Sequence, residues 1–144
     1  MFVVSRPLIE AFFMMMELNS KTVLITGATD GLGKNLAYRF AQKGSSLILH
    51  GRNPEKGKQL IDDIQSATGN LNIHYYNADF ASLEQVQLFS KEVIAHHMQL
   101  QILINNAAVG GGPKDTRGRE LSKDGLELRF AVNYLSHFLL TQNL

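Results

Sequence analysis

With 144 residues, of which 44% are hydrophobic and 19% charged, the chain has the size and composition of about one globular domain with a buried core. Its 14 basic and 13 acidic residues give a formal net charge of +1, which is too little positive charge to predict nucleic acid as a partner. The absence of cysteine excludes disulfides, thiolate metal sites and cysteine nucleophiles. His96 and His97 are adjacent and would point about 100° apart on a helix, so no metal site is predicted.

The first 20 residues are apolar in part but are interrupted by Arg6, Pro7 and Glu10. The apolar stretches are too short for a membrane span, and they lack the pattern of a secretory signal. We therefore predict an N-terminal extension over residues 1–20 and a cytoplasmic location. The alternative is that residues 1–16 contact a partner or associate peripherally with a membrane.

From Lys21 onward, short apolar runs alternate with longer periodic segments, which is typical of a parallel sheet covered by helices on both faces. Strands are predicted at residues 22–26, 46–50, 72–77 and 101–105. Helices are predicted at residues 31–43, 54–67 and 83–97, with Asn53 and Ser82 as N-caps of the second and third. A loop rich in Gly and Pro follows over residues 109–121. A last helix is predicted from near Asp124 to the end, with buried positions that include Leu128, Leu135, Phe138 and Leu139.

A glycine-rich turn, Thr26-Gly27-Ala28-Thr29-Asp30-Gly31-Leu32-Gly33, joins the first predicted strand to the first helix. Such a turn presents backbone N–H groups and the start of a helix to a phosphate, without a side chain in the way. Gly27 follows the strand directly, Gly31 allows close approach of a ligand to the backbone, and Gly33 allows the helix to pack closely. The spacing T-G-x-x-x-G-x-G differs from the G-x-G-x-x-G pattern that marks many dinucleotide sites.

This turn resembles that of the short-chain dehydrogenase/reductase family, and three later features agree with the resemblance. They are Asp79 after the third strand, Asn105-Asn106-Ala107-Ala108 after the fourth, and Asn133 within Val132-Asn133-Tyr134-Leu135. The segment around Asn133 is most similar to retinol-dehydrogenase-like members. The resemblance covers residues 21–144 and implies an α/β, three-layer, Rossmann-type doubly wound parallel sheet, truncated after about four strands. Residues 21–144 are then an NAD(P)-binding domain that is incomplete at its C-terminus.

By this resemblance, the cofactor-binding residues lie in the glycine turn and after each strand. Some of these assignments have a structural alternative, and Arg52 could be a solvated loop residue. Asp79 would serve the adenine edge of the cofactor, or it could cap a turn before Ser82, while Asn105 and Asn106 could satisfy backbone groups at a strand end. The predicted cofactor-binding residues are Gly27, Thr29, Asp30, Gly31, Leu32, Gly33, Arg52, Asn53, Asp79, Phe80, Asn106, Ala107 and Ala108.

The choice between the two nicotinamide cofactors depends on the end of the second strand, His50-Gly51-Arg52-Asn53. An NAD site usually places a carboxylate there for the ribose 2′-OH, whereas an NADP site offers a cation to the 2′-phosphate. No acid is present, and the Arg52 guanidinium can form charge-assisted hydrogen bonds with a phosphate. Asp30 opposes this interpretation, because its carboxylate would repel a nearby phosphate. We predict NADP(H) rather than NAD(H).

The resemblance implies hydride transfer between the nicotinamide and a carbonyl or alcohol, with a small, apolar substrate. It assigns Asn133 to a proton relay, but no tyrosine in the chain has a lysine four residues later. The partner serine and the Tyr-x-x-x-Lys pair of the family are therefore absent, and we expect an inactive part of a longer enzyme. A homo-oligomer is a possible assembly. The alternative function is a non-catalytic NAD(P)-binding or subunit-interaction module.

Overall fold

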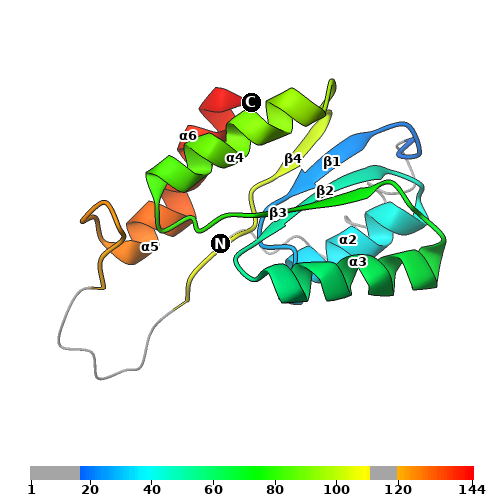
Figure 1. Ribbon diagram of the computed structural model, residues 1–144, viewed down its shortest axis with the longest axis horizontal. Coiled ribbons are helices and arrows are strands. Elements are labelled where there is room, and N and C mark those ends of the chain that lie inside the picture. Colours follow the sequence, from blue (N-terminus) through cyan, green and yellow to red (C-terminus); the bar gives the residue numbers. More distant parts are fainter. Residues whose placement is uncertain (1–16, 111–119) are drawn as a thin grey trace.

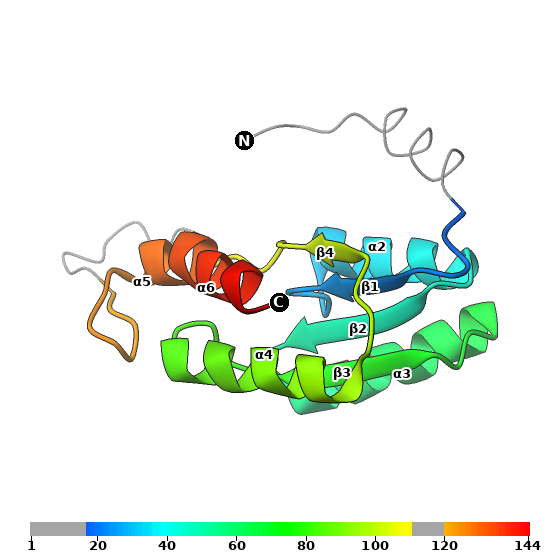
Figure 2. The same ribbon diagram turned by 90° about the horizontal axis from the view of Figure 1, so that it is seen from above.

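A computed structural model describes residues 17–110 and 120–144. Four strands form one parallel sheet: β1 (Thr22–Ile25), β2 (Ser46–Gly51), β3 (Ile73–Asn77) and β4 (Ile102–Ile104). Their order is β3-β2-β1-β4, and Figure 2 shows them side by side in this order. β1 pairs in parallel with β2 and with β4, and β2 pairs in parallel with β3, so all four strands point the same way. The predicted parallel sheet is confirmed.

Helices cover both faces of the sheet (Figure 1). On one face lie α2 (Gly31–Gln42) and α3 (Pro54–Thr68), and on the other lie α4 (Leu83–His96) and α6 (Ser136–Asn143). Successive side chains of a strand point to opposite faces. Val23 and Ile25 accordingly pack in the core beneath α2 and α3, while Leu24 packs in the core beneath α4. The three-layer α/β/α arrangement is therefore confirmed.

The starts of α3 and α4 follow from their capping residues. The side chain of Asn53 accepts a hydrogen bond from the Lys56 N–H (2.8 Å), and Pro54 occupies the first helical turn. Ser82 Oγ accepts from the Gln85 N–H (3.4 Å), as the capping-box spacing predicts. The reciprocal half of the box is not formed, because Gln85 Oε1 accepts instead from the backbone N–H of Asp79 (2.7 Å).

The last helix differs from the prediction at its start. Residues 122–125 form a turn in which Gly125 has a φ of +75° and the Asp124 carboxylate accepts from the N–H of Leu83, at the start of α4. The left-handed backbone of Gly125 prevents a helix from running through this turn. The helical segment begins instead with α5 (Leu128–Phe130), where Glu127 caps the Phe130 N–H (2.7 Å).

The helical segment is also interrupted, because a turn of π-helix, η1 (Ala131–Leu135), separates α5 from α6. A π-turn inserts an extra residue and changes which side chains face the core. The predicted burial of Phe138 was wrong, since its side chain is 54% exposed, and Leu128, Leu135 and Leu139 are only half-buried. The buried residues are instead Ala131, Ser136 and His137, among others. The Phe130 and Tyr134 rings stack on the exposed side (centroids 5.5 Å apart).

Leu18, which precedes β1, belongs to the core, and its carbonyl oxygen accepts a hydrogen bond from Ser45 Oγ (2.7 Å). Packing therefore extends at least to this residue on the N-terminal side. Residues 1–16, for which a membrane or partner contact was the alternative to an N-terminal extension, lie outside the described residues, as does most of the predicted loop at 109–121. Within residues 17–110 and 120–144, no helix combines the length and apolarity needed to cross a bilayer.

Candidate functional site

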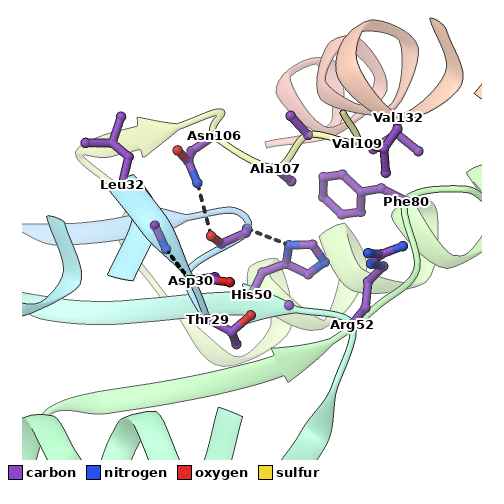
Figure 3. A pocket seen from close by; sticks show the side chains of 14 residues that line it. Thr29, Asp30, Leu32, His50, Arg52, Phe80, Asn106, Ala107, Val109 and Val132 are labelled. Carbon is purple, nitrogen blue, oxygen red and sulfur yellow. Dashed lines mark hydrogen bonds between the residues drawn. The ribbon is translucent and has the colours of Figure 1, made fainter. Parts of the chain in front are cut away.

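A pocket of about 530 Å³ lies at the edge of the sheet where the parallel strands end (Figure 3). This is the edge at which ligands bind in open α/β sheets. The glycine turn after β1 forms one wall, and the segments after β2, β3 and β4 form the others. The lining residues are Gly27, Thr29, Asp30, Gly31, Leu32, His50, Gly51, Arg52, Phe80, Asn106, Ala107, Ala108, Val109 and Val132.

Most of the predicted cofactor-binding residues thus lie together around this pocket, but not all of them. Gly33, Asn53 and Asp79 are not among its lining residues, and neither is Asn133. Four lining residues were absent from the prediction: His50, Gly51, Val109 and Val132. His50 and Gly51 belong to the strand end on which the choice of cofactor depends, Val132 belongs to the Asn133 motif, and Val109 follows predicted Ala108, so position in the sequence was the signal for all four.

Two glycines give the turn its shape. Gly27 has a φ of +64°, and a Cβ there would lie 2.7 Å from Ala107 Cα, so no larger residue fits against the segment after β4. Gly31 has a φ of +52°, and a Cβ there would meet nothing within 4 Å. The backbone at Gly31 therefore faces open space in the pocket, where a ligand can approach the start of α2 closely.

Asp30 is the N-cap of α2. Its Oδ1 accepts a hydrogen bond from the Gly31 N–H (2.7 Å), as Figure 3 shows. The carboxylate therefore satisfies one of the free N–H groups at the start of the helix. Asp30 also lines the pocket, so its carboxylate would oppose the binding of a phosphate beside it.

Thr26 joins the glycine turn to the segment after β4. Its hydroxyl oxygen is buried and accepts hydrogen bonds from the backbone N–H groups of Asn106 (2.9 Å) and Ala107 (3.0 Å). The Asn106 side-chain amide in turn donates to the carbonyl oxygens of Thr26 (2.9 Å) and Gly27 (3.0 Å). Asn106 thus satisfies backbone groups at the strand ends, as one of the two interpretations of its sequence position predicted.

His50 lies beneath the turn and is almost completely buried. Its Nε2 lies 2.9 Å from the Ala78 carbonyl oxygen, which can only accept, so Nε2 carries the proton. Nδ1 is then free to accept from the Gly27 N–H (3.4 Å). Burial lowers the pKa of His50 to about 4, against the opposing effect of its hydrogen bond with Ala78, so the ring is neutral at neutral pH.

Phe80 separates His50 from a second buried histidine, His137. The Phe80 ring stacks on His50 (centroids 4.1 Å apart) and meets His137 edge to face (5.4 Å). His137 Nδ1 faces the Asn133 carbonyl oxygen (3.5 Å), and Nε2 lies 3.1 Å from Thr26 Oγ1. Burial also lowers the pKa of His137. Two buried histidines therefore contact the start of the glycine turn, His50 at Gly27 and His137 at Thr26.

Arg52 lines the pocket from the loop between β2 and α3, and it is exposed. In the part of the chain that the structure describes, no carboxylate lies within ion-pair distance of its guanidinium group. The neighbouring Asn53 is occupied as the N-cap of α3. Of these two predicted residues, Arg52 is the one whose side chain can reach an anionic ligand.

Asp79 makes the contacts of a turn cap. One carboxylate oxygen accepts from the Ala81 N–H (3.0 Å), and the other lies 3.2 Å from Lys123 Nζ. Burial alone would raise the pKa of Asp79, but the hydrogen bond and the ammonium group hold that pKa below its usual range. The following residue, Phe80, lines the pocket in its place.

Asn133 lies in the π-turn η1 and bonds to the segment after β4. Its Oδ1 accepts from the Val109 N–H (2.8 Å), and its Nδ2 donates to the Val109 carbonyl oxygen (3.1 Å). This pair of bonds fixes the helix against the far end of the pocket. Among residues 17–110 and 120–144, no three His, Asp or Glu side chains gather in a way that could hold a metal ion.

The sheet order, the glycine turn and the pocket at the strand ends define a Rossmann-type domain. Residues 21–144 match the family model described as short chain dehydrogenase, and the chain belongs to this family of oxidoreductases.

Individual relatives agree with this family assignment. The chain is 41% identical over 121 residues to retinol dehydrogenase 13 of Mus musculus, and 35% identical over 121 residues to polyprenol dehydrogenase of Homo sapiens. Each alignment covers 84% of this chain but only 35% of the relative, so the chain spans about a third of their length. A metagenomic short-chain oxidoreductase solved in complex with NADP matches 89% of this chain and 56% of its own, with a TM-score of 0.74 and 27% identity.

Proposed function

We propose that this chain is the NADP-binding part of a short-chain dehydrogenase/reductase that transfers hydride between the nicotinamide and a carbonyl or alcohol. The observation that carries the proposal is the pocket at the strand ends, with the open Gly31 backbone and the exposed Arg52 guanidinium among its lining residues. A pyrophosphate can lie against the start of α2, and a 2′-phosphate can reach Arg52. The metagenomic relative solved with NADP supports this cofactor.

The proposed substrate is small and apolar, and its reacting group is an alcohol or a carbonyl. Two relatives are named for retinol and polyprenol, which are both alcohols with long hydrocarbon chains. The pocket is consistent with such a substrate, because Val109 and Val132 supply apolar surface beside Phe80 at one end of it (Figure 3). The cofactor would supply the hydride. Asn133 would hold this end of the pocket in place and is the proposed member of a proton relay.

We expect the 144-residue chain to bind NADPH without oxidising it. A general acid is needed to protonate the reduced carbonyl oxygen, and no Tyr-x-x-x-Lys pair occurs among the 144 residues. The measurement is NADPH absorbance with retinal or another apolar aldehyde present. Oxidation of NADPH at a rate above that of the Asn133→Ala variant would contradict this expectation.

The same lack of a tyrosine–lysine pair favours a second candidate function, a non-catalytic NADP-binding or subunit-interaction module. A module of this kind would fold cooperatively as a soluble monomer and bind NADPH. An insoluble or partly folded chain would favour the enzyme interpretation, in which further residues complete the domain. Sedimentation and thermal unfolding of the purified chain distinguish the two.

The proposed role of Arg52 predicts that Arg52→Gln weakens NADPH binding about 10-fold and leaves NADH binding unchanged. The loss corresponds to one charge-assisted interaction with the 2′-phosphate, which NADH does not have. Titration calorimetry with both cofactors measures the effect. Lys58→Gln, an exposed charge on α3 outside the pocket, is the matched control and should change neither affinity. Equal losses for NADPH and NADH in Arg52→Gln would contradict the role.

A further inference from the structure

At the end of β2, the side chains of Tyr75 and Thr29 fill the space beside Gly51. A Cβ at this position would lie 2.7 Å from the Tyr75 hydroxyl oxygen and 2.9 Å from the Thr29 methyl carbon. Gly51 is not among the glycines with positive φ, so its backbone suits any residue. Space alone therefore restricts this position to glycine.

The Tyr75 side chain cannot easily move aside. Its ring lies against Gly57 of α3, where an added Cβ would overlap the ring carbons. Its hydroxyl group donates a hydrogen bond to the carbonyl oxygen of Asn53 (2.9 Å). The ring is thus held between Gly51 and Gly57, and its tip is attached to the loop that carries Arg52.

Position 51 is where a dinucleotide site would accept the ribose 2′-OH, at the end of the second strand. It lines the pocket together with Thr29 and Arg52. A carboxylate side chain there would need the space that Tyr75 and Thr29 fill. The hydrogen bond from Tyr75 to Asn53 also fixes the backbone next to Arg52, and a side chain with a fixed backbone loses less conformational entropy on binding.

We propose that Tyr75 is a positioning residue that determines cofactor specificity: with Thr29 it prevents a carboxylate at position 51, and it holds the Arg52–Asn53 segment in place for a 2′-phosphate. The inference rests on the proposed NADP-binding function. It adds to that function a residue of β3 that does not itself line the pocket.

The first test is Tyr75→Phe, which keeps the ring and removes the hydrogen bond to Asn53. The ratio of NADPH to NADH affinity should fall about 3-fold, which corresponds to loss of part of one hydrogen bond's contribution. A general loss of stability would weaken both cofactors alike and leave the ratio unchanged. Tyr134→Phe, at an exposed tyrosine of η1, is the matched control and should keep the original ratio.

The second test introduces the carboxylate. Gly51→Asp alone should weaken binding of both cofactors without producing a preference for NADH. Gly51→Asp combined with Thr29→Ser and Tyr75→Thr, which open the space, should bind NADH at least 10-fold more tightly than Gly51→Asp alone. Circular dichroism reports the folding of each variant, and Tyr75→Phe keeps the inference testable if the Gly51 variants do not fold.

The outcomes separate the inference from the function on which it rests. If the unmodified chain binds NADH as tightly as NADPH, the NADP-binding proposal fails. If the unmodified chain prefers NADPH, two results overturn the role of Tyr75: an unchanged ratio in Tyr75→Phe, or a preference for NADH in Gly51→Asp alone. A lower ratio in Tyr75→Phe, together with recovery of NADH binding in the triple variant, supports it.

Discussion

Replacing Gly33 by alanine is expected to lower the free energy of unfolding by about 3 kcal/mol, because the added methyl group would overlap the Gly27 carbonyl oxygen. It would also lie 2.5 Å from the Asn106 side-chain nitrogen. Both neighbours belong to the hydrogen-bonded link between the glycine turn and the segment after β4. Alanine stabilises a helix by up to about 1 kcal/mol relative to glycine, which is too little to offset the overlap. NADPH binding should be lost with the shape of the turn.

Denaturant unfolding and calorimetric titration measure the two effects. The control is Gly69→Ala at the C-cap of α3, where φ is +72° and a Cβ would meet nothing within 4 Å. This variant carries the strain of a left-handed backbone without an overlap, so we expect a loss of about 1 kcal/mol and unchanged NADPH binding. A Gly33→Ala variant as stable as Gly69→Ala would show that the turn accommodates the methyl group.

The buried His50 should make the protein less stable as the pH falls below 6.5. In the unfolded chain a histidine binds its proton near pH 6.5, whereas in the folded protein burial lowers the pKa of His50 to about 4. Between these values the unfolded chain binds more protons, so acid favours unfolding. His50 alone should lower the free energy of unfolding by about 2 kcal/mol between pH 7 and pH 5.

The measurement is denaturant unfolding of the unmodified chain and of His50→Gln at a series of pH values from 7 to 4. Glutamine can still donate to the Ala78 carbonyl oxygen, and it does not titrate. The difference between the two chains isolates His50 from His97 and His137, whose pKa values burial also lowers. Parallel pH profiles for the two chains would contradict this prediction, because they would mean that folding does not lower the pKa of His50.

Local patterns in the sequence were sufficient to predict the four strands of the sheet and the starts of α2, α3 and α4, and the glycine turn indicated where the site lies. Apolar runs bounded by glycine or asparagine located all four strands, and Asn53-Pro54 predicted the start of α3 at the residue where it begins. Parallel strands bring the segments after them to one edge of the sheet. The family resemblance assigned Gly31, Arg52 and Ala107 to one cofactor site, and the structure brings them to one pocket at this edge.

The packing of buried residues around the pocket could not be predicted, because it depends on contacts between residues that are distant in sequence. A single histidine has no period or spacing that marks it, so nothing in the sequence indicated that His50 and His137 lie on either side of Phe80. The π-turn likewise had no signal, and the burial of Phe138 was predicted wrongly from a regular helical period. The turn-cap contact of Asp79 with Ala81 was one of the two interpretations of its sequence position, whereas its ion pair with Lys123 had no signal in the sequence.

The bonds of Thr26 also have a consequence for how the protein folds. Thr26 is separated in sequence from Ile104 by 78 residues, from Ala107 by 81 and from His137 by 111. A ribosome needs roughly 4 to 16 seconds to add 80 residues. During synthesis the glycine turn therefore leaves the ribosome long before the segment that holds it. We expect the nucleotide pocket to form late, when β4 closes against β1, so that the proposed cofactor would stabilise the folded chain rather than its early intermediates.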